Sequence, residues 1–180
     1  MDQKRGSIHV SDFTMMMRNT HPPNSACAAI FLMNRPTRRR PLTKADLLPL
    51  PAANVRALSL EHHLALSVVR NGQGTVDQLA CLARTTYFVF YMRDMIPHGV
   101  DLNMLRQAET VLERWFAQLE HDKSVELNPD ELRTFEAIIA LHDAQLTITP
   151  AHRYRDAWER VRGYFLSGKI TSPIPQSTDI

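Results

Sequence analysis

The chain has 180 residues, 44% of them hydrophobic, a formal net charge of +2 and two cysteines. A chain of this length fits one domain whose core needs neither disulfides nor a metal. No apolar run approaches the ~18 residues that cross a bilayer, and Cys27 and Cys81 lack the spacing of a zinc or redox pair, so we expect a cytoplasmic protein without a cofactor and without membrane contact.

The charge is distributed unevenly along the chain. Residues 1–44 carry eight Lys and Arg against two Asp and Glu, whereas residues 45–180 carry thirteen against seventeen. Six of the eleven prolines precede residue 54, and this stretch has almost no helical periodicity. We therefore expect residues 1–53 to be disordered or extended, with a short helical turn at Lys44–Leu48 that Thr43 caps.

Two helices are predicted next. The first spans about residues 58–71, and Gly72 is its expected C-terminal cap. Its expected apolar face is formed by Leu60, Leu64 and Val68 with the neighbouring Ala57 and Leu66. The second spans about residues 75–96 and begins with a capping box. Its second half, residues 85–92, is apolar nearly all round and rich in β-branched and aromatic residues, so a strand is the alternative there, but the continuous pattern from Leu79 favours a buried helix. Such a helix is expected at the centre of the fold or, alternatively, as half of a homodimer core.

Three further helices follow, and each has a capping residue at its start. Asp101 begins one, Asn128 with Pro129 and Glu131 begins the next, and Thr149 with Pro150 begins the last, which ends near residue 168. Their expected buried stripes are Leu105, Ala108, Leu112, Trp115 or Phe116, and Leu119; Leu132, Phe135, Ile139, His142 and Leu146; and Tyr154, Ala157 or Trp158, Val161 and Phe165.

These elements predict the fold class. Short connections between successive helices favour antiparallel neighbours, so residues 54–168 should form an all-α bundle of about five helices. Residues 169–180 should form a flexible tail.

Few residues are candidates for chemistry. His142 falls on an apolar stripe with Asp143 and Gln145 turned away from it, and these three residues form a candidate polar core, structural or functional. His62 and His63 point about 100° apart on a helix and are expected at an exposed or boundary position. A catalytic role would need His142 beside a carboxylate such as Asp143 in an open pocket.

Other enzyme and binding classes are not favoured. No Glu-x-x-His of a di-metal bundle and no Gly-x-Ser-x-Gly of a hydrolase occurs in the chain. A helix-turn-helix is disfavoured because the would-be recognition segment, residues 85–92, has no Arg, Lys, Asn or Gln for base edges. We expect no catalytic residues and no metal ligands.

The basic segment is the best binding candidate. Four arginines, Arg35, Arg38, Arg39 and Arg40, occupy six positions beside Pro36 and Pro41, with Lys44 close behind. A flexible arginine cluster binds nucleic-acid phosphates without reading base sequence. The alternative is a solvated tail, or a segment that folds over the acidic body.

Two stretches carry a family resemblance. Residues 33–41 (MNRPTRRRP) and 130–149 (DELRTFEAIIALHDAQLTIT), followed by a last helix, resemble small uncharacterised helical proteins encoded in phages and other mobile elements of β-proteobacteria. Some of these carry the label of Fis-type regulators, but this chain lacks the basic recognition helix which that function requires. The resemblance implies relatives that begin at the basic segment, so we expect translation to start at Met33 and residues 1–32 to be a mis-assigned extension. A native peptide from residues 5–18 would contradict this.

Taken together, the pattern predicts a non-enzymatic regulatory or accessory module of a mobile element. Its partner is nucleic acid, bound through the basic arm, or alternatively a host protein that the acidic helical surface inhibits or recruits.

Overall fold

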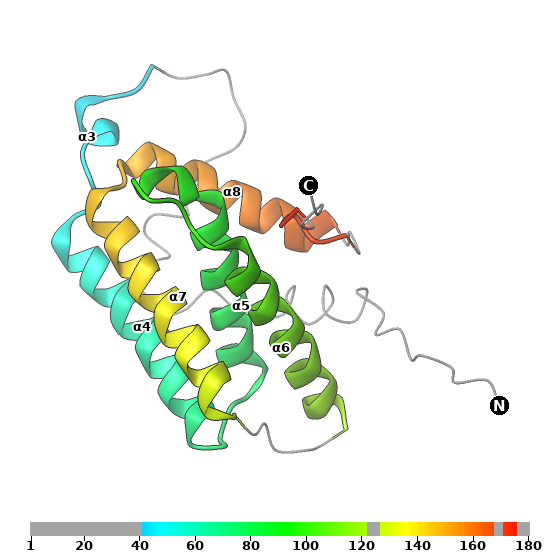
Figure 1. Ribbon diagram of the computed structural model, residues 1–180. Helices are drawn as coiled ribbons and strands as arrows, with labels where there is room; N and C mark the ends of the chain where they lie inside the picture. Colours follow the sequence, from blue (N-terminus) through cyan, green and yellow to red (C-terminus); the bar gives the residue numbers. More distant parts are fainter. Residues whose placement is uncertain (1–40, 122–126, 168–170, 176–180) are drawn as a thin grey trace.

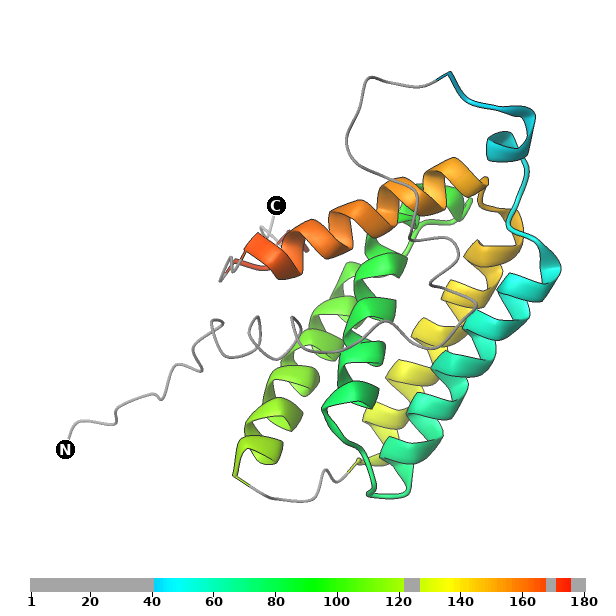
Figure 2. The same cartoon turned by 180° about the vertical axis from the view of Figure 1, so that it is seen from behind.

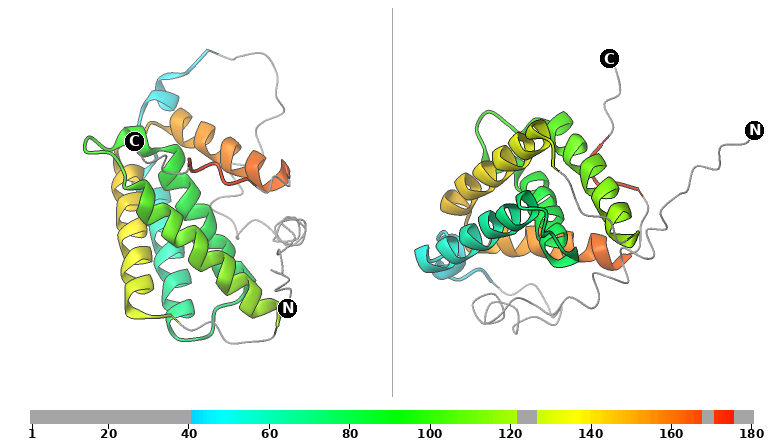
Figure 3. Two further views of the ribbon diagram at one scale, coloured as in Figure 1. Left: turned by 45° about the vertical axis from the view of Figure 1, so that its right-hand side comes forward. Right: turned by 90° about the horizontal axis from the view of Figure 1, so that it is seen from below.

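The computed structural model describes residues 41–121, 127–167 and 171–175. Four antiparallel helices, α4 (Ala52–Arg70), α5 (Val76–Tyr91), α6 (Leu102–Glu120) and α7 (Pro129–Ile148), form a bundle, and α8 (Ala151–Ser167) runs across one end of it (Figure 1). Two short elements complete the described chain, α3 (Lys44–Leu47) and the 3-10 helix η1 (Arg93–Met95). The predicted all-α bundle is confirmed, although the fifth long helix crosses the others instead of running along them (Figure 3).

Helix α5 lies at the centre of the bundle. It contacts α4, α6, α7 and α8, and eleven of its sixteen residues are buried. Its two buried threonines, Thr85 and Thr86, donate their hydroxyl hydrogens to the carbonyls of Cys81 and Leu82 one turn earlier, so both of these hydroxyls are paired. The helix is therefore covered by helices of its own chain, as expected for the centre of the fold.

The predicted helix starts are confirmed by their capping boxes. Thr75 with Gln78 begins α5, Asn128 with Glu131 begins α7, and Thr43 with Asp46 begins α3. Gly72 has a φ of 71° and its N–H donates to the carbonyl of Val69, which is the expected glycine cap of α4. These local signals were readable because they depend on residues three positions apart.

The prediction for α4 was wrong in its start and in most of its face, of which only Leu66 is buried. The helix begins at Ala52, and Leu60 and Leu64 are 60% and 55% exposed. Figure 2 shows α4 and α7 side by side, and α4 also contacts α5. The face toward these two helices buries Leu58, His62, Ala65, Leu66 and Val69.

Both ends of the described chain are more ordered than the sequence predicts. The segment 43–50 docks on α8, and Leu50 is buried. At the other end, Ser172 donates a hydrogen bond to Glu109 and Ile174 is buried. Residues 1–40 and 176–180, which include most of the predicted disordered segment and part of the tail, lie outside the described residues. The helix predicted to reach residue 96 ends at Tyr91 and continues as η1.

Two glycines should respond oppositely to alanine. A Cβ at Gly74 would lie 2.9 Å from Val69 Cγ2 and 3.3 Å from Val69 Cα, so Gly74→Ala forces the α4–α5 turn apart and should cost about 1–3 kcal/mol. Gly163, inside α8, has open space around such a Cβ, so Gly163→Ala should stabilise the fold by about 0.5–1 kcal/mol. Urea unfolding gives the free energy of unfolding of both variants. Equal changes in the two would contradict the close packing of Gly74 against Val69.

Candidate functional site

The predicted phosphate-binding residues lie at the edge of the described chain. Arg35, Arg38, Arg39 and Arg40 fall outside the described residues. Lys44 is the first residue of α3, and it is exposed. Because four residues span at most about 14 Å, the arginine cluster ends close to Lys44. The position of α3 therefore decides where the cluster attaches to the bundle.

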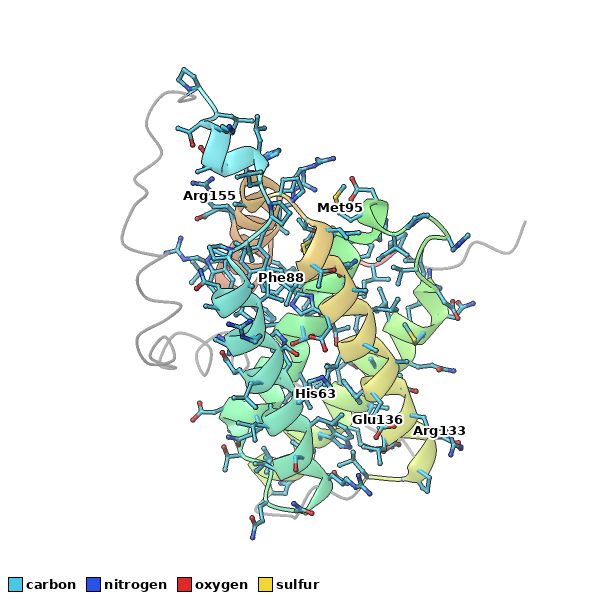
Figure 4. All side chains as sticks on the ribbon, turned by 90° about the vertical axis from the view of Figure 1, so that its left-hand side faces the viewer. His63, Phe88, Met95, Arg133, Glu136 and Arg155 are labelled. Atoms are coloured by element: carbon cyan, nitrogen blue, oxygen red, sulfur yellow. The ribbon has the colours of Figure 1, made fainter. Side chains whose placement is uncertain are left out.

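Residues 43–50 are fixed to the first turn of α8. The carboxylate of Asp46 forms an ion pair with Arg155, and the carbonyl of Asp46 accepts a hydrogen bond of 2.8 Å from His152 Nδ1. The Ala151 N–H donates to the Leu48 carbonyl at 2.8 Å, and Pro49 forms an isolated bridge with Pro150. Figure 4 shows Arg155 beside α3. We call residues 43–50 the arm root.

Asp46 joins the cap of α3 to its anchor on α8. It accepts hydrogen bonds from the Thr43 N–H at 2.9 Å and the Thr43 hydroxyl at 2.7 Å, in addition to Arg155. The Thr43 bonds and, after them, the Arg155 guanidinium hold the pKa of Asp46 well below its usual range. Asp46 is therefore ionised at neutral pH and supplies the charge that the anchor needs.

Trypsin should detect release of the arm root. The Lys44–Ala45 bond is a tryptic site, whereas Arg40–Pro41 is not, so cleavage after Lys44 reports on this segment. Asp46→Ala removes the cap and the Arg155 pair, and we expect cleavage after Lys44 to become several-fold faster, since a protease needs a locally open chain. Asp130→Ala is the control, because it removes an ion pair with Arg133 inside one helix. Equal rates in both variants, measured by mass spectrometry, would mean that Asp46 does not hold the arm root.

Helix α8 is the most basic of the long helices. It carries Arg153, Arg155, Arg160 and Arg162 against Asp156 and Glu159. Beside it, a hollow of about 200 Å³ opens between the end of α5, η1 and α8. Arg93, Arg153 and Arg160 line this hollow together with Asp94 and Asp156. The basic helix and the arm root therefore occupy the same end of the bundle.

Acidic residues concentrate on the other side of the molecule. In the described parts of α6 and α7 and their caps, eight Asp and Glu outnumber three Arg. Glu113 and Glu136 are exposed, and neither forms an ion pair within the described chain. Figure 4 shows Glu136 and Arg133 along α7, away from α3 and Arg155. The bundle thus separates its charges between α8 and the α6–α7 side.

The structure divides the predicted polar core. His142 is fully buried, as its stripe predicted, and its ring lies 4.9 Å from the ring of His62 and 5.4 Å from that of Phe88. Asp143 instead forms an ion pair of 2.9 Å with His63 on α4. Gln145 does not turn away from the core as predicted: it is fully buried and donates its amide to the Val89 carbonyl at 3.1 Å.

The buried histidine pair was missed because its members come from different helices. His62 is 6% exposed, so only its neighbour His63 occupies the predicted exposed position. His62 Nδ1 and both ring nitrogens of His142 are buried without a hydrogen-bond partner. Burial lowers the pKa of His62 to about 3 and that of His142 to about 4. At His62, repulsion from a positive charge on His142 lowers the pKa further. Both rings are therefore neutral at pH 7, and His142 lines no open pocket.

A second polar cluster was not predicted. Glu109 of α6 accepts hydrogen bonds from Tyr87 at 2.9 Å and from Ser172 at 2.6 Å, and Tyr87 also lies 3.5 Å from the Tyr164 hydroxyl. Burial raises the pKa of Glu109. The cluster fastens residues 171–175 to α5 and α6, and no local sequence pattern links these four positions.

Comparison with known proteins identifies no relative of this chain. No family model, curated protein or solved structure matches the chain. Among the residues that the structure describes, no group of three or more His, Cys, Asp or Glu is arranged to hold a metal ion. No helix in the described ranges is long and apolar enough to span a membrane.

Proposed function

We propose that this protein is a non-enzymatic accessory binding module of a mobile element, that it acts in the cytoplasm, and that Arg35, Arg38, Arg39, Arg40 and Lys44 contact nucleic-acid phosphates without sequence specificity. The observation that carries the proposal is the attachment of the arm root to α8. Through Asp46–Arg155 and His152, the segment that directly follows the four arginines in the sequence is attached to the most basic long helix.

Physical reasons favour phosphate as the ligand. Guanidinium groups bind phosphate oxygens in a bidentate geometry, and each neutralised phosphate releases counterions, so affinity grows with every arginine that makes contact. The one residue that the sequence offers for catalysis, His142, is enclosed by His62 and Phe88.

The full-length protein tests this proposal by fluorescence anisotropy with labelled oligonucleotides. Two unrelated single-stranded sequences of equal length should bind with affinities within about threefold of each other at ~50 mM salt, and both affinities should fall steeply as salt rises. Failure to bind either oligonucleotide at ~20 mM salt, where phosphate contacts are strongest, would overturn the proposal.

The acidic α6–α7 side supports a second candidate, in which the protein inhibits or recruits a basic host protein. Its exposed Glu113 and Glu136 have no ion-pair partner within the described chain. Poly-lysine is a suitable model of such a partner. Binding that the double substitution Glu113→Gln and Glu136→Gln weakens would favour this candidate, and absence of poly-lysine binding at low salt would remove it.

A further inference from the structure

The hollow beside α8 has the charge and the fixed donors of a phosphate site. Arg93 lies over the Phe90 ring, 4.4 Å from its centroid, and donates a hydrogen bond of 2.9 Å to the Phe90 carbonyl. Arg153 forms an ion pair of 3.2 Å with Asp94. Arg93 and Arg153 are therefore engaged by the chain itself, whereas Arg160, the third guanidinium that lines the hollow, forms no ion pair with a described residue and is available to a ligand.

The remaining charges indicate which phosphate fits. Asp94 is neutralised by Arg153, and Asp156 lies one helical turn before Arg160 on the same face of α8. Arg93 and Arg160 then face a single unpaired carboxylate, so the hollow carries a net charge of +1. A phosphodiester group carries one negative charge and matches this balance, whereas a terminal phosphate carries nearly two at pH 7.

The hollow and the arm root flank the same turns of α8. Arg153 points to the hollow and Arg155 to the arm root, as expected for residues two positions apart on a helix. Figure 4 shows Arg155 and Met95, which lines the hollow, on opposite sides of this end of the molecule. A strand held by the arm thus needs only to cross the start of α8 to reach the hollow.

We infer that the hollow between η1 and α8 seats one phosphodiester group of the strand that the arginine cluster holds, with Arg160 as the guanidinium that binds it. This inference rests on the proposed phosphate binding, and it adds a second contact, on α8, to that of the arginine cluster. A contact on α8 sets the direction in which the strand leaves the arm, which phosphate contacts of the arm alone do not do.

Four substitutions on one helix test the site. Arg160→Gln removes the guanidinium that binds the phosphodiester group. Asp156→Asn removes the carboxylate whose negative charge repels that group. Arg162→Gln and Glu159→Gln are the matched controls, because these exposed residues lie on the same helix and pair with each other at 4.0 Å. The probe is a labelled single-stranded oligothymidylate, titrated into the full-length protein over a salt series.

We expect Arg160→Gln to weaken binding about 3–10-fold and to lower the salt slope by about one phosphate contact, and Asp156→Asn to strengthen binding by a similar factor. The two controls should change affinity by less than about twofold. If Arg160→Gln and Arg162→Gln weaken binding equally, binding depends only on the overall positive charge of α8. The inference about the hollow is then wrong, while the proposed function stands. If the unsubstituted protein does not bind at all, both fall together.

Discussion

Between pH 7 and pH 5, the protein should lose about 4 kcal/mol of its free energy of unfolding, because two buried histidines must remain neutral in the fold. Burial lowers the pKa of His62 to about 3 and that of His142 to about 4, whereas the unfolded chain titrates near the ordinary value of 6.5. Below pH 6.5, these two histidines therefore bind protons in the unfolded state but remain neutral in the folded state. Each histidine then costs about 2 kcal/mol by pH 5.

The two carboxyl groups with shifted pKa values, Asp46 and Glu109, do not account for the loss of stability between pH 7 and pH 5. The pKa of Asp46 is lowered, so its contribution is present above the ordinary carboxyl value and is lost only below about pH 4. The pKa of Glu109 is raised, so the folded state binds that proton more readily and gains stability as pH falls. Glu109 therefore opposes the acid loss, and the histidine pair is the source of it.

His142→Leu isolates the contribution of one ring. Leucine is close in size and removes two unpartnered buried nitrogens, so stability at pH 7 should change little or rise. The loss between pH 7 and pH 5 should shrink from about 4 to about 2 kcal/mol, measured by urea unfolding followed by circular dichroism. His98→Gln is the control, since His98 is exposed and should leave the pH dependence unchanged. An unaltered acid loss in His142→Leu would show that the buried pair is not its cause.

The parts of the fold that follow from local sequence were predictable. The capping boxes of α5 and α7 and the buried stripes of α6, α7 and α8 depend on residues three or four positions apart, and they were confirmed. On α4 two faces compete: Leu60 and Leu64 lie on one, and Leu58, Ala65 and Val69 lie on the other together with His62. The structure buries the second face, so His62 meets His142 across the seam between α4 and α7, and sequence periodicity carries no information on such a pairing.

The candidate site was predictable only in part, because its contacts join residues that are far apart in the sequence. The arginine cluster is visible as composition, but its attachment depends on Asp46 and Arg155, which are 109 positions apart. Prolines at positions 41, 49 and 51 made the arm root resemble an unstructured segment, yet beside Pro49 and Pro150 the Ala151 N–H donates to the Leu48 carbonyl and holds it. Likewise the hollow beside α8 brings Arg93 to Arg153 and Arg160, and no single helix predicts that set.

Neutralising the arginine cluster should have the largest effect on binding. Each arginine that contacts single-stranded nucleic acid contributes about 0.7 to the salt slope, which corresponds to roughly fivefold in affinity at ~0.1 M salt. Replacing Arg35, Arg38, Arg39 and Arg40 by Gln should therefore weaken binding by roughly 10²–10³-fold and reduce the slope by nearly three. The fold should be unaffected, because the arm root and its anchor on α8 are retained.

The same four positions changed to Lys provide the control, because charge is kept while bidentate geometry is lost. Binding of the Lys variant should stay within about tenfold of the unsubstituted protein and keep most of its salt slope. The most direct measurement is the anisotropy titration of one oligothymidylate with the unsubstituted protein, the Gln variant and the Lys variant across the salt series. We predict a steep slope that the Gln substitutions flatten and the Lys substitutions preserve; equal slopes in all three proteins would contradict phosphate binding by the arm.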